Sequence, residues 1–398
     1  MKKLLLTCLL VPSLAWAQNG LQLLENLKRI ESTGTVLHVA AHPDDESTHM
    51  LAWFAQEQHW ETNYFAFTRG DGGQNLIGDE QGIPLGLIRT QELLAARKID
   101  GANQYFSQAF DFGFSKSTTE ALSFWNKELI LSNLVLVIRK MRPDIIFTRF
   151  PPDARAGHGH HSASAVLAIE AYKAAADPTK FPEQLVNGIK PWQAKRLLWN
   201  TFRFPGSSTS TIAPDQFKME IGDYLPSIGQ STGEMAAFSR SQHKSQGFGF
   251  AVDHGKQTEY FATLAGDAPK VNLWDGVENH WPEIGIGLES QLDQIIAQYQ
   301  AEDPTASIAG LLSVRKSIMA SKDAFWKAKK IKQIDAWIVQ AAGIHFAATT
   351  NQGTISRGDT LSVKSEFILR SKVGISDLSL RIAGKDTIFS GPTKAYQK

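Results

Sequence analysis

Cysteine is almost absent from the sequence, since Cys8 is the only one among 398 residues. It lies in a leader-like segment expected to be removed, so the mature chain can form no disulfide, and a metal ion would have to be bound by histidine and carboxylate side chains. An excess of either charge is also lacking, because 41 lysines and arginines face 40 aspartates and glutamates. This balance argues against nucleic acid or an anionic membrane surface as a partner.

The first seventeen residues have the pattern of a secretory signal peptide. Residues 2–3 are lysines, residues 4–14 form an apolar stretch, and residues 15–17, Ala-Trp-Ala, match a small-x-small cleavage site. The apolar stretch is too short to span a bilayer, and no later segment has the pattern of a transmembrane helix. We therefore expect residues 1–17 to be cleaved and the protein to be secreted or periplasmic.

Strand-like and helix-like segments alternate along the first half of the chain. Apolar, β-rich runs predict buried strands at 36–41, 62–68 and 143–150, with a shorter strand within 105–112. The segments between and after them predict helices at 47–58, 87–99, 121–141 and 162–176. This alternation predicts an α/β fold in three layers, a parallel sheet with helices on both faces.

The rest of the chain has three different patterns. Residues 182–286 are irregular and rich in Trp, Pro and Gly, and we expect them to build walls around a site and to complete a first domain over 18–286. Residues 287–345 predict a helical extension. Residues 346–398 alternate as strands do and predict a β-rich tail, the start of a β-sandwich that the sequence leaves incomplete.

The first predicted strand ends in an unusual concentration of charge, the stretch HPDDE with His42, Asp44, Asp45 and Glu46. Three carboxylates this close repel one another unless a cation compensates them. The alternative is a plain helix start, where acidic residues offset the helix dipole, but that does not explain the histidine. Glu46 fits either interpretation, as a support for a site or as a first-turn acid.

Three histidines follow the predicted strand at 143–150. His158, His160 and His161 lie in the stretch GHGHH. Because the carboxyl ends of parallel strands meet at one edge of a sheet, we expect these histidines and His42 in one region. Alone, GHGHH could be an exposed polar loop; paired with HPDDE, it favours a metal site.

Histidine and carboxylate ligands with one open position are typical of a catalytic zinc site. Such an ion lowers the pKa of its water from about 15.7 to about 7. A free carboxylate beside that water can act as general base, and an imidazole can protonate the leaving nitrogen or stabilise an oxyanion. A tight turn after Pro43 would aim Asp44 and Asp45 in different directions, so that one binds metal and the other takes a proton. These residue types suit the hydrolysis of an amide.

The motifs also resemble a known family, the PIG-L / LmbE-like de-N-acetylases. The resemblance spans roughly residues 34–250 and rests first on AHPDDE followed by a GHxxH loop. Further matching stretches are TRGDGGQNLIG (68–78), RTQELLAAR (89–97), FDFG (110–113) and FSRSQHKSQGFG (238–249). The resemblance implies a Rossmann-like zinc hydrolase that acts mainly on N-acetylglucosamine-type amides.

The family pattern also implies roles for individual residues. His42, Asp45 and His161 would be the metal ligands, Asp44 the general base, and His158 the acid or oxyanion partner. The implied ion is Zn²⁺, with another divalent metal such as Fe²⁺ as the alternative. The residues implied as substrate contacts are Arg89, Asp111 and His243.

One position departs from the family pattern. The family often has GHxDH, with an aspartate directly before the third ligand, whereas this chain has His160 there. The aspartate helps to tune the neighbouring histidine, so its absence bears on the acid role of His158. Asp153, in the same loop, is a candidate replacement.

Together these patterns predict an exported zinc-dependent N-deacetylase that removes acetyl groups from an N-acetylglucosamine-type sugar or glycoconjugate. Two alternatives stay open. A metallohydrolase of a non-sugar amide or ester is one, because the motif specifies the metal and water but not the acyl group. A non-catalytic glycan-binding module is the other, favoured by His160 and by the β-rich tail.

Overall fold

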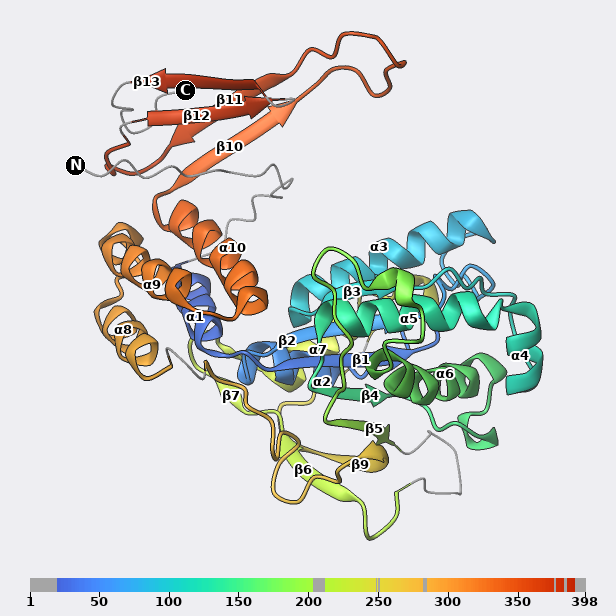
Figure 1. The fold of residues 1–398 in the computed structure, drawn as a ribbon. Helices are drawn as coiled ribbons and strands as arrows, with labels where there is room; N and C mark the ends of the chain where they lie inside the picture. Colours follow the sequence, from blue (N-terminus) through green and yellow to red (C-terminus); the bar gives the residue numbers. More distant parts are fainter. Residues whose placement is uncertain are drawn as a thin grey trace. The chain divides into compact units, whose positions relative to one another are not determined.

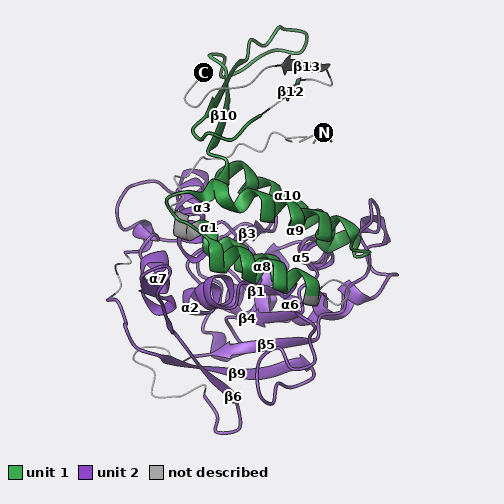
Figure 2. Cartoon of the chain, turned by 90° about the vertical axis from the view of Figure 1, so that its left-hand side faces the viewer, with its two compact units in different colours: residues 1–31, 282–398 green, residues 32–281 purple. Residues whose placement is uncertain are grey.

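The structure, a computed structural model, describes residues 20–202, 212–247, 249, 251–281, 285–375, 377–382 and 385–390. The predicted signal peptide lies outside the described residues. The chain forms two compact units, one of residues 32–281 and one of residues 1–31 together with 282–398 (Figure 2).

The larger unit is built on a seven-stranded sheet (Figure 1). In chain order its strands are β1 (Thr35–Ala40), β2 (Glu61–Ala66), β3 (Asn103–Phe106), β4 (Ile145–Thr148), β5 (Arg196–Thr201), β6 (Phe217–Ile221) and β9 (Gln257–Gly266). Across the sheet they stand in the order β3-β2-β1-β4-β5-β9-β6. The first five pair in parallel, while β9 runs antiparallel to both β5 and β6. The predicted α/β fold with a mostly parallel sheet is confirmed.

Helices cover both faces of this sheet. They are α2 (Thr48–Ala52), which continues as a π-helix (Trp53–Glu57), α3 (Ile83–Asp100), α4 (Thr118–Phe124), α5 (Lys127–Met141), α6 (Gly159–Ala176) and α7 (Thr232–Arg240). Successive residues of β1 enter opposite cores, as the period of two in a strand requires. Leu37 and Val39 belong to the core that contains α5 and α6. Val36 and Ala40 belong to the core that contains α2 and Leu93 of α3.

The strand order reverses direction between β1 and β4. The chain steps outward from β1 to β2 and β3, then returns to place β4 on the other side of β1. In open α/β sheets, ligands bind beyond the carboxyl ends of the strands at such a switch point. The loops that follow β1 and β4 hold the HPDDE and GHGHH stretches, so the topology brings the two motifs to one place.

The helix predicted over 121–141 is two helices. The chain is extended at Trp125, and the Asn126 side chain then caps α5 by accepting from the N–H of Leu129. The axes of α4 and α5 differ by 92°. A hydrophobic pattern alone does not reveal this break, because Asn126 caps a helix only once the preceding residue leaves the helical conformation.

The region 182–286 is more regular than expected from its composition. It contributes β5, β6 and β9 to the sheet and α7 to the helical layer. Two very short strands, β7 (Tyr224–Leu225) and β8 (Gln230–Ser231), also pair there. All six residues of β5 are buried, so this segment is a core strand that the surrounding Trp, Pro and Gly residues obscured.

The smaller unit combines helices with two antiparallel strand pairs. Its helices are α1 (Gly20–Glu31), α8 (Gly285–Gln298), α9 (Ile308–Ala320) and α10 (Ala324–Ala341). Its strands β10 (Ile344–Thr349) and β11 (Lys364–Leu369) form one pair, and β12 (Asp377–Ile382) and β13 (Lys385–Ser390) the other. The Lys330 ammonium on α10 donates to the Arg29 carbonyl at the end of α1. Helix α1 therefore groups with the C-terminal helices, although the sequence placed it in the first domain.

No single helix among the described residues is both long enough and apolar enough to cross a membrane. Helices α4 and α5 reach that length and composition only when taken together, across their sharp bend.

The fold predicts a pH-dependent stability at Asp144, directly before β4. Burial raises the pKa of its carboxyl to about 7, and Oδ2 accepts the N–H of Thr35 at 2.9 Å. Between roughly pH 4, where an unfolded aspartate ionises, and pH 7, the folded state holds a proton that the unfolded state has lost. Stability should therefore fall as the pH rises through this window.

The Asp144→Asn variant keeps an oxygen acceptor for Thr35 but cannot ionise. We expect its free energy of unfolding, relative to the parent, to increase from pH 4.5 to pH 8. Urea unfolding at both pH values measures this. A difference that is the same at the two pH values would contradict the assignment.

Candidate metal centre

The loop after β1 places His42 and Asp45 against each other. The backbone N–H of His42 donates to Asp45 Oδ2 at 2.7 Å, and the ring Nδ1 lies 3.0 Å from the same oxygen. The Tyr64 hydroxyl, from neighbouring strand β2, donates to the His42 carbonyl at 2.6 Å. The end of the strand is thus held by its own turn and by an adjacent strand.

His161 approaches from the first turn of α6. Its Nε2 lies 3.5 Å from Asp45 Oδ1, while its Nδ1 lies 3.2 Å from the Ala156 carbonyl. A carbonyl accepts only, so that contact places the proton on Nδ1 and the lone pair on Nε2, facing Asp45. The ring stacks on Phe150 with 3.7 Å between centroids, which fixes its plane.

His42, Asp45 and His161 offer three donor atoms that all lie within 4.8 Å of one another. Zinc bonds of about 2.0–2.2 Å at tetrahedral angles would separate neighbouring donors by roughly 3.3–3.6 Å. Burial alone would raise the pKa of Asp45, but the imidazoles of His161 and His42 outweigh it and hold that pKa well below its usual range. An ionised carboxylate with two histidines is a donor set that fits a zinc-type ion.

Asp44 lies next to this set in an unusual backbone conformation, with φ at +93°. For a residue other than glycine such strain costs about 1–3 kcal/mol. Its carboxylate Oδ1 accepts from Arg89 of α3 at 2.7 Å, and its N–H donates to Glu46 at 2.9 Å. Burial raises the pKa of the Asp44 carboxyl, against the opposing charge of Arg89.

Arg89 holds this turn through the two terminal nitrogens of its guanidinium group. It also donates to the carbonyls of Pro43 at 2.6 Å and Gly70 at 3.0 Å, and only 3% of its surface is exposed. Gly70 has a φ of +71°, and a Cβ there would lie 2.4 Å from the guanidinium, so glycine is required at this position. The predicted substrate contact is thus, in this structure, a residue that orients Asp44.

Glu46 is fully buried beneath the turn. It accepts from Arg97 at 3.2 Å and lies 2.7 Å from His243 Nε2. Burial alone would raise the pKa of Glu46, but His243 and Arg97 lower it. Arg240 of α7 donates to the Asp44 and Glu46 carbonyls. Of the two interpretations of Glu46, the geometry favours a support for the site.

His243 needs a correction as a predicted substrate contact. Its relative exposure is 0%, and its ring is directed at Glu46. A side chain with no exposed surface cannot contact a substrate in this conformation. His243 reaches the site through Glu46.

His158 caps the N-terminus of α6 and packs against Ser115. Its Nδ1 lies 3.1 Å from the N–H of His160, and its Nε2 lies 3.3 Å from the N–H of Ser115. A neutral imidazole has one acceptor nitrogen, so only one of these contacts is a hydrogen bond. The shorter contact leaves the proton on Nε2. Burial, with the nearby His161 and His42, lowers the pKa of His158 to about 4, which favours the neutral ring.

His160 and Asp111 lie on the other side of His42. His160 is fully buried, and its Nδ1 is 3.1 Å from His42 Nε2. Asp111 lies 3.8 Å from both of these nitrogens, and its Oδ1 accepts the N–H of Gly113 at 2.9 Å. Asp111 was predicted to contact a sugar hydroxyl; with 7% of its surface exposed, it borders His42 and His160.

Asp153, the candidate replacement for the missing aspartate, does not reach the histidines. Both of its oxygens accept from the Arg155 side chain, at 2.9 and 2.7 Å, in an exposed pair. At the position of the missing aspartate, His160 itself contacts His42, a candidate metal ligand.

The structure thus brings His42, Asp45 and His161 together, with the ring of His158 beside His42 and with Asp44 in the same turn as Asp45. The residues that sequence reasoning missed are Arg97, Arg240 and Ser115. The sequence did contain a signal for Arg97. It lies eight residues after Arg89 on the same predicted helix and therefore shares its face.

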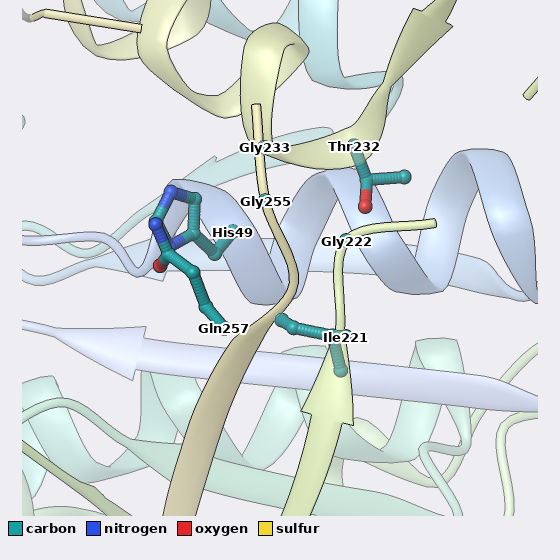
Figure 3. A pocket seen from close by; sticks show the side chains of 7 residues that line it. All are labelled: His49, Ile221, Gly222, Thr232, Gly233, Gly255 and Gln257. Atoms are coloured by element: carbon teal, nitrogen blue, oxygen red, sulfur yellow. The ribbon is translucent and has the colours of Figure 1, made fainter. Parts of the chain in front are cut away.

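A separate hollow lies beside α2, between β6, α7 and β9 (Figure 3). It is lined by His49, Ile221, Gly222, Thr232, Gly233, Gly255 and Gln257. None of these residues belongs to the histidine–carboxylate set, so the hollow does not form part of the candidate metal centre.

Fold and site together define a class, an α/β protein with a histidine–carboxylate cluster at the switch point of its sheet. Residues 37–172 match the family model described as PIG-L: GlcNAc-PI de-N-acetylase. The resemblance read from the motifs is confirmed over this range.

Similar proteins with assigned activities include two from Streptomyces. The 1D-myo-inositol 2-acetamido-2-deoxy-alpha-D-glucopyranoside deacetylase of Streptomyces avermitilis is 29% identical over 184 residues, which cover 42% of this chain and 60% of that protein. The enzyme of the same name from Streptomyces scabiei is 27% identical, over 42% of this chain and 55% of that protein. The chain therefore matches somewhat more than half the length of these relatives.

Among solved structures, the N,N'-diacetylchitobiose deacetylase of Pyrococcus horikoshii matches with a TM-score of 0.40 and 18% identity, over 53% of this chain and 70% of that one.

The buried ion pairs of Glu46 predict a large effect on stability. The Glu46→Ala variant leaves His243 without its buried carboxylate and removes one of the two carboxylates paired with Arg97, which keeps Asp100. Leaving a buried polar group without its partner costs about 1–3 kcal/mol. The Glu46→Gln variant keeps an oxygen acceptor and should lose less. Urea unfolding of the metal-free proteins measures both values, and equal stabilities of Glu46→Ala and the parent would exclude a supporting role.

Proposed function

We propose that this protein is an exported, metal-dependent hydrolase that removes N-acetyl groups from an N-acetylglucosamine-type sugar or glycoconjugate. The observation that carries this is the convergence of His42, Asp45 and His161 on one point, with Asp44, the neighbour of Asp45 in the same turn, held by Arg89. Zn²⁺ is the ion that best suits two imidazoles and one carboxylate, with Fe²⁺ as the alternative.

A bound Zn²⁺ supplies Lewis acidity, lowering the pKa of a water to about 7 and polarising the acyl carbonyl. Asp44 acts as the general base that takes a proton from the attacking water. Arg89 holds one carboxylate oxygen, which fixes the direction of the other. The raised pKa of Asp44 suits this task, because a base is most effective when its pKa lies nearer the working pH.

His158 acts on the opposite side of the substrate. With the proton on Nε2, the neutral ring can donate a hydrogen bond to the developing oxyanion. The proton that Asp44 takes from the water is then available for the leaving amine. Phe114 packs edge-on against its ring, with centroids 4.9 Å apart, and is 71% exposed. Phe114 therefore offers an apolar surface beside the position where the substrate would bind.

The acetylated sugar is supported by the relatives, which are named as deacetylases of an N-acetylated glucosaminide. Export, proposed from the N-terminal pattern, favours an envelope, extracellular or dietary glycan as substrate. Hydrolysis of a non-sugar amide or ester, and glycan binding without turnover, are the outcomes that the following experiment separates.

We expect the mature protein, purified without chelator, to hold about one metal ion per chain, as a three-ligand site requires. It should release acetate from N-acetylated sugars. The Asp44→Asn variant should keep its metal and lose acetate release by 10²-fold or more, in line with loss of a general base. Metal content and acetate release measure the two properties separately.

The outcomes decide between the alternatives. Turnover of non-sugar amides or esters with none of N-acetylated sugars would favour the other metallohydrolase. Glycan affinity that is the same in the parent and in Asp44→Asn, without turnover in either, would favour the binding module. A parent that stays metal-free when zinc is supplied would contradict the proposal.

Arg89 gives a second test, because its two interpretations predict different kinetics. The Arg89→Lys variant keeps the charge but cannot reach Asp44 and two carbonyls at once. If Arg89 orients the base, kcat should fall about 10–100-fold with a smaller change in KM. A raised KM with kcat unchanged would show instead that Arg89 binds the sugar.

A further inference from the structure

The two ring nitrogens of His42 have different neighbours. Nδ1 lies 3.0 Å from Asp45 Oδ2, on the side of the candidate metal ligands. Nε2 lies 3.1 Å from Nδ1 of His160, the residue that departs from the GHxDH pattern. The family pattern has a carboxylate at this position, whereas this chain has a second imidazole.

We propose that His160 is a positioning residue for the metal centre. Without an ion, His42 Nδ1 lies 3.0 Å from Asp45 Oδ2 and donates to it; when an ion takes the place of that proton, Nδ1 of His160 accepts the Nε2–H of His42 and keeps the Nδ1 lone pair directed at the position between Asp45 and His161. The proposal rests on the metal site of the proposed function. A histidine that binds metal through one nitrogen carries its proton on the other, and the partner of that proton fixes tautomer and ring orientation. Here that partner is a neutral imidazole.

The surroundings of His160 hold its ring in place for this contact. Its backbone N–H donates to the Ser115 hydroxyl at 2.8 Å. The ring stacks on Trp125 with centroids 4.8 Å apart and meets the edge of Phe112 at 4.3 Å. A ring packed between two aromatic side chains cannot turn its Nδ1 away from His42 without repacking the core.

The other nitrogen of His160, Nε2, is buried and makes no competing hydrogen bond with the described residues. The contact with His42 is therefore the interaction through which the His160 ring acts on the site. Removing the acceptor would leave the buried Nε2–H of His42 unpaired, which favours the wrong tautomer.

A second ion is the rival explanation, because His42, His158 and His160 also offer donor atoms within 4.8 Å of one another. Two observations favour the hydrogen bond. The separation of 3.1 Å lies within the usual hydrogen-bond range. One nitrogen of His158 is also already close to the backbone N–H of His160. The rival nevertheless makes a distinct prediction, two ions per chain.

The experiment compares three variants by metal binding, without substrate. In His160→Asn, an amide oxygen can occupy the place of Nδ1 and accept from His42. His160→Leu fills the volume of the ring but has no acceptor, and His160→Ala removes both the volume and the acceptor. These two variants therefore share the loss of the acceptor but differ in packing. The metal-free proteins are titrated with Zn²⁺ against a chelator and with Co²⁺ for its absorption spectrum, and their thermal melting checks the fold.

We expect one ion per chain in the parent. His160→Leu and His160→Ala should bind Zn²⁺ about 10–100-fold more weakly, the usual effect of losing such a partner. His160→Asn should keep most of the affinity and the Co²⁺ spectrum of the parent, because the ligands themselves are unchanged.

Several outcomes would overturn the proposal. Undiminished affinity in His160→Leu or His160→Ala would show that the contact is dispensable. Affinity as weak in His160→Asn as in His160→Leu would show that the acceptor is not what matters. Two ions in the parent and one in every variant would make His160 a ligand. A parent that binds no Zn²⁺ would refute the metal site of the proposed function as well, whereas the first three outcomes leave that function intact.

Discussion

The compensation of three carboxylates in one turn is the constraint on which this site depends. Asp44, Asp45 and Glu46 follow a buried strand directly, and each meets a different cationic or protonatable partner. Asp44 pairs with Arg89, and Glu46 pairs with Arg97, both from α3. The carboxylate between them lies against two imidazoles. It is the one for which a metal ion, rather than a guanidinium, would supply the positive charge.

Because their partners differ, these three consecutive residues divide into carboxylates that support the turn and carboxylates that are available for chemistry. A buried carboxylate paired with arginine is fixed in place and strongly stabilised as the anion, which suits a scaffold. Glu46 is of this kind, since none of its side chain is exposed. Asp44 keeps 18% of its side chain exposed despite its arginine. Burial also raises its pKa, so it is the member of the cluster suited to exchange a proton.

The sequence could predict which residues meet, because parallel strands open their loops at one edge. That argument needs only the strand positions, and it brings His42 and His161 together correctly. It cannot place side chains that arrive from helices packed on the sheet. Arg240 lies 196 residues from Asp44 in sequence, and only the packing of α7 beside α3 brings them together. The buried position of His243 depends on the same packing.

Local conformation accounts for the other differences between expectation and structure. At Asn126 and in β5, the local sequence is compatible with more than one conformation, and tertiary packing selects the helix break in the first case and the strand in the second. The turn at Asp44 shows the reverse case, in which tertiary contacts impose a conformation that the residue itself disfavours. Its N–H, its carbonyl and its carboxylate are each held by a different residue. The energy that maintains the strained turn therefore comes from the same contacts that orient the carboxylate, so the stability of this turn and the alignment of the site have one physical origin.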